Sequence, residues 1–125
     1  MKLILDAGAF VAVEKPDRRI GAMSRVLQQR RTPVRTSSAV VAQIWRDGRK
    51  QAAISRLLAG VDTRPLAPDD DKRTGELLAA ARTNDVVDGH VAILAEDGDF
   101  VMTSDKREIE RLLEARGIAV ILVEI

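Results

Sequence analysis

The segment Met1-Lys2-Leu3-Ile4-Leu5-Asp6-Ala7-Gly8-Ala9-Phe10 opens the chain and indicates its architecture. Its apolar run, Leu3-Ile4-Leu5, has the length of a buried strand, and the carboxylate of Asp6 follows where that run stops. A charge at the end of a buried strand is costly unless another group compensates it. The rest of the chain must therefore supply a partner for Asp6.

The composition predicts one globular domain over residues 1–125. The chain has the length of an ordinary domain, and no Ser-, Gly- or Pro-rich linker divides it. There is no cysteine, which excludes disulfides, thiolate metal sites and thiol nucleophiles. Apolar runs are too short for a membrane span, and the opening run is too short for a signal peptide, so we expect a cytoplasmic protein without membrane contact.

The charges are unevenly distributed along the chain. Residues 1–65 contain 13 Lys and Arg against 5 Asp and Glu, whereas residues 66–125 contain 7 against 14. Such polarisation can mark a polyanion-binding side opposite a cation-binding side. The more common outcome is a solvated surface on which the opposite charges mix after folding.

Short apolar runs and helical periodicities alternate along the chain. Strands are expected at residues 3–5, 33–36, 61–66, 100–103 and 118–123. Helices are expected at residues 7–13, 17–31, 39–48, 51–58, 68–82, 86–96 and 106–116, with Asp17, Ser37 or Ser38, and Asp85 as N-caps and with Gly48 and Gly117 as helix ends. The aspartates that open the 68–82 helix are interpreted as capping residues and not as metal ligands.

This alternation predicts an α/β fold with a central, mostly parallel sheet of about four to five strands and helices on both faces. Ligands in such folds bind beyond the carboxyl ends of the strands. Asp6 and Asp105 each follow a predicted strand, so we expect both on that edge of the sheet. Asp88 lies in the first turn of its predicted helix, and it would lie near Asp6 and Asp105 if the turn before that helix lies at the same edge of the sheet. Three such carboxylates would favour a hard cation, Mg²⁺ or Mn²⁺.

Four motifs together resemble the PIN-domain ribonucleases and, within them, the VapC-type toxins of bacterial toxin–antitoxin pairs. The resemblance covers nearly the whole chain and rests on the order and spacing of the motifs. These are Leu3-Ile4-Leu5-Asp6-Ala7-Gly8-Ala9, Thr36-Ser37-Ser38-Ala39-Val40-Val41-Ala42-Gln43, Asp85-Val86-Val87-Asp88-Gly89-His90 and Thr103-Ser104-Asp105.

The resemblance implies a three-layer PIN-like fold and an endoribonuclease that cleaves RNA with one or two Mg²⁺ or Mn²⁺ ions. By this analogy Asp6, Asp88 and Asp105 are the catalytic, metal-binding acids. Ser37 would be a polar neighbour, and Glu108 a further acidic residue. The resemblance also implies a homodimer that acts as a toxin and is neutralised by a small, VapB-like antitoxin.

The chain departs from the family at Gln43, where a glutamate is usual. An amide can coordinate a metal through its carbonyl oxygen but brings no negative charge. Asp47, one turn further along, would compensate only if the helix were placed differently. An alternative is therefore a weakened or inactive PIN-like domain that binds RNA or a protein. A further alternative is another doubly wound phosphoryl-transfer or response-regulator domain, although the paired acids expected beside Asp6 are not evident.

Several other residues have competing interpretations. We interpret His90 as a partly buried helix residue that points away from Asp88, not as a catalytic base, and Asp85 as an N-cap, not as a ligand. Trp45 is expected to be a core residue or an interface anchor, not a platform for bases. Two basic clusters would bind RNA phosphates or be solvated helix ends: Arg30-Arg31-Arg35 and Arg46-Arg49-Lys50.

Overall fold

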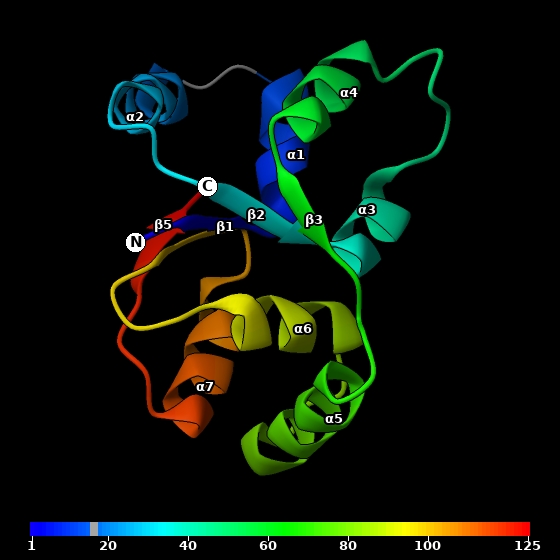
Figure 1. Ribbon diagram of the computed structural model, residues 1–125, viewed down its shortest axis with the longest axis vertical. Helices are drawn as coiled ribbons and strands as arrows, with labels where there is room; N and C mark the ends of the chain where they lie inside the picture. Colours follow the sequence, from blue (N-terminus) through cyan, green and yellow to red (C-terminus); the bar gives the residue numbers. More distant parts are fainter. Residues whose placement is uncertain (16–17) are drawn as a thin grey trace.

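Five parallel strands form the middle layer of the computed structural model, which describes residues 1–15 and 18–125 (Figure 1). Their order is β3-β2-β1-β4-β5, and every pairing is parallel. The strands are β1 (Leu3–Leu5), β2 (Val34–Ser37), β3 (Asp62–Arg64), β4 (Phe100–Thr103) and β5 (Ile121–Glu124). The predicted α/β architecture is therefore confirmed. The predicted N-cap Asp17 lies outside the described residues.

Helices cover both faces of the sheet (Figure 1). One face carries α1 (Ala7–Glu14), α2 (Arg18–Gln29) and α4 (Ala52–Ala59), and the other carries α5 (Asp70–Ala81), α6 (Val86–Leu94) and α7 (Lys106–Arg116). The short α3 (Ser38–Ile44) continues directly from β2, at the carboxyl end of the sheet. No helix in the described part of the chain is long and apolar enough to cross a membrane.

The middle strand, β1, is buried along its whole length. It pairs with β2 on one side and with β4 on the other, so an uninterrupted apolar run is the pattern that this position requires. The largest fully buried side chains include Ile4, Phe10, Val91 and Ile109. Because these come from β1, α1, α6 and α7, the core joins both helical layers to the sheet.

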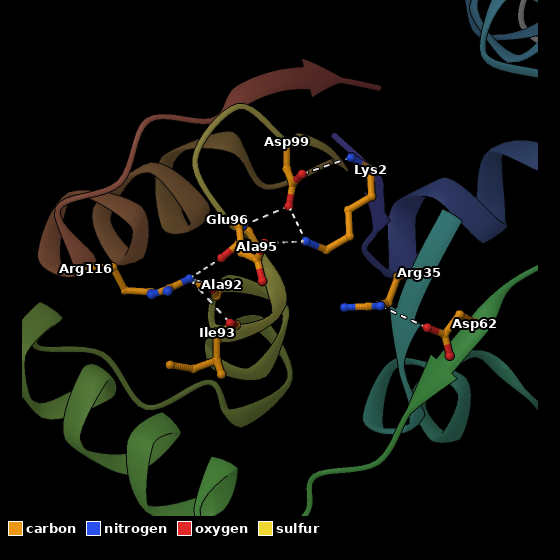
Figure 2. A network of polar contacts seen from close by, with 9 residues as sticks. All are labelled: Lys2, Arg35, Asp62, Ala92, Ile93, Ala95, Glu96, Asp99 and Arg116. Atoms are coloured by element: carbon orange, nitrogen blue, oxygen red, sulfur yellow. Dashed lines mark hydrogen bonds and ion pairs between the residues drawn. The ribbon is translucent and has the colours of Figure 1, made fainter. Parts of the chain in front are cut away.

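Polar contacts fix the amino edge of the sheet and the end of α6 (Figure 2). Lys2 Nζ lies 2.7 Å from Asp99 Oδ2, and the backbone amide of Lys2 donates to Asp99 Oδ1 at 2.9 Å. Arg116, the last residue of α7, donates through Nη1 to the carbonyl oxygens of Ala92, at 2.6 Å, and of Ala95. These carbonyls have no partner within their own helix, so α7 caps the C-terminal end of α6.

Some predicted helix and strand ends are wrong. The predicted 39–48 helix ends at Ile44, because the side chain of Gln51 binds the backbone that follows: its Nε2 donates to the Ile44 carbonyl oxygen at 2.9 Å. Gly48 therefore does not end a helix. Smaller shifts affect α6, which ends at Leu94, and β5, which begins at Ile121.

Candidate active site

Asp6 lies at the carboxyl end of β1 and is the N-cap of α1. Only 4% of its surface is exposed. The amide of Ala7 donates to Oδ1 at 2.7 Å, and the hydroxyl of Thr103 donates to Oδ2 at 2.7 Å. Burial raises the pKa of Asp6, these hydrogen bonds oppose the rise, and the nearby charges of Asp85 and Asp105 add to it.

Asp88 lies in the first turn of α6 and is 8% exposed. Its amide donates to Oδ1 of Asp85 at 3.0 Å, which confirms Asp85 as the N-cap of this helix. Burial raises the pKa of Asp88 to about 7, and the charges of four further acids contribute to the rise: Asp6, Asp85, Asp105 and Glu108. The structure therefore brings the three predicted aspartates within electrostatic reach of one another.

Asp105 and Glu108 occupy the first turn of α7, beside the carboxyl end of β4. Asp105 is exposed and is the N-cap, and its amide donates to Thr103 Oγ1 at 2.9 Å. Glu108 accepts a hydrogen bond from the hydroxyl of Thr83, in the turn before α6. This contact joins the start of α7 to the segment that leads to Asp88.

Ser37 is fully buried and is hydrogen-bonded to His90. The Oγ of Ser37 lies 2.6 Å from Nδ1 of His90 and also accepts from the amide of Ala39 at 3.0 Å, as the N-cap of α3. The other ring nitrogen, Nε2, makes no hydrogen bond and lies 3.9 Å from Oδ2 of Asp70. His90 is fully buried, not partly buried as predicted, and burial lowers its pKa although Asp70 opposes this.

Gly8 lies where α1 approaches the end of β4. A Cβ atom at this position would meet Ser104 Oγ at 2.4 Å and Ser104 Cβ at 2.7 Å. Real Cβ atoms do not approach other atoms so closely, so this contact requires glycine. The absent side chain allows the segments that carry Asp6 and Asp105 to come together.

The predicted accessory and RNA-binding residues lie on α3 and the loop after it. Gln43 is exposed on α3, and Arg49 and Lys50 are exposed on the loop. Arg46 donates through Nη1 to the Trp45 carbonyl oxygen at 2.7 Å, so part of its guanidinium caps α3. In the other basic cluster, Arg35 Nε instead pairs with Asp62 Oδ2 on β3 at 3.0 Å (Figure 2), whereas Arg30 and Arg31 are exposed.

The donor set at this edge fits a hard cation in its chemistry. All members are carboxylates, and burial raises the pKa of Asp6 and of Asp88, with repulsion from neighbouring acids adding to the rise. Within residues 1–15 and 18–125, however, no three or more His, Asp or Glu side chains are already grouped so as to hold a metal ion. Asp6 and Asp88, which are buried at this edge, are the first candidates to hold an ion, and the exposed Asp105 is the third.

Sequence reasoning missed two features of this edge. The sequence places Thr103 at the end of a strand and in the Thr103-Ser104-Asp105 motif, but it does not reveal that its hydroxyl bonds both Asp6 and the amide of Asp105. The Ser37–His90 hydrogen bond was not foreseen because the two residues are 53 positions apart. The signal available for Thr103 was its place directly before Ser104-Asp105, at the end of a buried strand.

No family model and no curated protein matches the sequence. Among solved structures, the chain is similar to one in the crystal structure of VapBC2 from Rickettsia felis bound to a DNA fragment from their promoter, with a TM-score of 0.73 and 14% identity over 99% of this chain and 100% of that one. It is also similar to one in DNA-bound VapBC from Salmonella typhimurium, with a TM-score of 0.64 and 20% identity over 98% of each chain. At these identities the likeness shows the fold, which is PIN-like as predicted.

Proposed function

We propose that the chain is a Mg²⁺- or Mn²⁺-dependent endoribonuclease and the toxin of a toxin–antitoxin pair. The proposal includes a VapB-like antitoxin as partner, an RNA substrate, a homodimer and action in the cytoplasm. The observation that carries it is the set of four acids, Asp6, Asp85, Asp105 and Glu108, around the buried carboxyl of Asp88: burial and these charges together raise the pKa of Asp88 to about 7. The PIN-like fold shared with chains of two VapBC complexes supports the same function.

The residues of the chain have separate tasks in this proposal. Asp6, Asp88 and Asp105 would hold the ion, and the Thr103 hydroxyl would keep Asp6 oriented. When bound, the ion supplies activation of the attacking water and stabilises charge on the phosphoryl oxygens. The exposed cations of the α3–α4 loop would bind RNA phosphates.

The test is cleavage of a labelled single-stranded RNA by the purified chain in Mn²⁺ and in EDTA. We expect cleavage in Mn²⁺ alone, and its loss in Asp6→Asn with the circular dichroism spectrum unchanged. Glu76→Gln, an exposed acid on α5, is the matched control and should cleave like the wild type. Full activity of Asp6→Asn would refute the metal assignment. Growth arrest on expression, relieved by a short protein encoded directly upstream, would test the toxin role.

Gln43 supports a second candidate, a PIN-like domain that binds RNA or a protein with little or no cleavage. Its side chain is neutral and exposed on α3, where the family usually has a glutamate. Gln43→Glu separates the two candidates: a large gain in Mn²⁺-dependent cleavage from near zero would favour the binding module. Comparable cleavage by both forms would favour the enzyme.

A further inference from the structure

Trp45 is the single tryptophan of a chain without tyrosine, and it is 37% exposed. It is not a core residue, although tryptophan is highly buried on average. Part of the ring rests on Gly48, since a Cβ atom there would lie 2.9 Å from Trp45 Cζ2. The other aromatic residues are less exposed: Phe10 is fully buried and Phe100 is half-buried. Among the two Phe and one Trp side chains, all of which the structure describes, that of Trp45 is the most exposed and the most accessible to a partner.

The loop that carries this ring is held by side-chain hydrogen bonds. Oε1 of Gln51 accepts from the amides of Arg46, at 2.8 Å, and Asp47, at 3.0 Å. Its Nε2 donates to the carbonyl oxygen of Ile44, and Arg46 Nη1 donates to that of Trp45. The backbone on both sides of Trp45 is therefore ordered before any ligand arrives, which reduces the entropy lost on binding.

The charged residues next to Trp45 in the sequence are mainly positive. Arg46, Arg49 and Lys50 lie within five residues of Trp45, against the single acid Asp47. Arg49 Nε is 3.6 Å from Asp47 Oδ1, but the Arg49 side chain is 94% exposed, and a pair so open to solvent is weak. Its guanidinium remains able to bind a phosphate.

α3, whose C-cap is Trp45, leads away from the edge of the sheet that carries the acids. Its N-cap, Ser37, is the last residue of β2 at that edge, and the seven residues of the helix span about 10 Å, so Trp45 stands about one short helix from the edge (Figure 1). Tryptophan and arginine are common at protein interfaces as well as in proteins that bind single-stranded nucleic acid, but lysine is depleted at protein interfaces. Lys50 and the excess of positive charge next to Trp45 in the sequence therefore favour a nucleic acid.

We propose that Trp45 stacks on one base of single-stranded RNA while Arg49 and Lys50 bind the adjoining phosphates. This subsite rests on the proposed function, since it takes the same substrate. It adds a place for a splayed base outside the acidic cluster. Stacking accepts any base, so the subsite adds affinity without reading a particular sequence.

The experiment uses the fluorescence of Trp45, which is the whole tryptophan signal of the protein. The wild-type chain is titrated in EDTA with a short single-stranded RNA and, separately, with an abasic strand of equal length. We expect saturable quenching by the RNA and little quenching by the abasic strand. Trp45→Ala should weaken RNA binding, measured by anisotropy of a labelled strand, about 10-fold, equivalent to about 1.4 kcal/mol, and leave abasic binding unchanged. Trp45→Phe should retain most of the affinity.

Other outcomes would overturn the proposal. Equal quenching by both strands, or unchanged RNA affinity in Trp45→Ala, would show that the ring does not stack. Fluorescence that changes with protein concentration alone would assign the ring to an interface between two copies of the chain. Binding is measured in EDTA and cleavage in Mn²⁺, so failure of the stacking proposal does not decide the cleavage test. A wild-type chain that binds no RNA at all would refute both proposals.

Discussion

Thr103 donates its hydroxyl hydrogen to Oδ2 of Asp6 over 2.7 Å, which joins the carboxyl ends of β4 and β1. Thr103 Oγ1 also accepts a hydrogen bond from the backbone amide of Asp105. Thr103→Val keeps the shape but removes both bonds, so we expect the free energy of unfolding to fall by about 2 kcal/mol, the range for a buried hydrogen bond to a charged group. Urea unfolding at neutral pH measures this. Thr103→Ser keeps the hydroxyl and should recover most of the loss.

Asp88 makes stability depend on pH. Its pKa is raised from 3.8 to about 7 in the folded protein, so between these values the folded chain holds a proton that the unfolded chain has lost. This contribution is fully present below about pH 4 and is lost as the pH rises to about 7. Asp88→Asn cannot lose a proton there. We expect it to be about 4 kcal/mol more stable than the wild type at pH 8 without divalent ions, since the pKa rises by about 3 units and each unit is worth about 1.4 kcal/mol.

The measurement is urea unfolding of both proteins at several pH values from 4 to 8. The difference in stability should grow through this range and level off above about pH 7. A difference that is constant with pH would show that Asp88 does not titrate in this way.

Two glycines provide a matched pair of substitutions. Gly8→Ala would place a Cβ atom 2.4 Å from Ser104 Oγ, and we expect a loss of about 1–3 kcal/mol from the forced shift. Gly75→Ala, on an exposed turn of α5 with nothing within 4 Å, should instead stabilise the protein by up to about 1 kcal/mol. Thermal unfolding of both variants checks this. Equal effects would show that α1 does not approach β4 as described.

Gln51 should control the order of the loop after α3. Gln51→Ala removes the acceptor of two backbone amides, so we expect faster hydrogen exchange at Arg46 and Asp47. Gln29→Ala, at the exposed end of α2, is the control and should leave the exchange at these amides unchanged. Unchanged exchange in Gln51→Ala would mean that the loop is ordered by other contacts.

The sequence predicted the features that depend on local pattern. The apolar run of β1 and the position of Asp6 after it followed from residues 3–6 alone, because a central strand in a parallel sheet is buried on both faces. The meeting of Asp6 and Asp105 followed from the rule that parallel strands end at one edge. Asp85 was identified as an N-cap from its residue type and its place before an apolar helix.

Features that depend on distant side chains could not be predicted. The end of α3 is determined by Gln51, seven residues beyond Ile44, and nothing in the helical periodicity of residues 39–48 marks that contact. The complete burial of His90 depends on its contact with Ser37, on another strand–helix unit. The exposure of Trp45 also follows from the position of the loop and not from its composition.

Arg116 gives α6 an anchor at the end opposite the acids. The nine residues of this helix carry Asp88 in the first turn, and Arg116 binds the carbonyls after the last turn. A rigid helix transmits a displacement of one end to the other. A change at position 116 can therefore shift the position of Asp88 although the two residues lie at opposite ends of α6. A substitution in the last turn of α7 can therefore change the spacing of the acids from the other end of α6, while every acidic residue is kept.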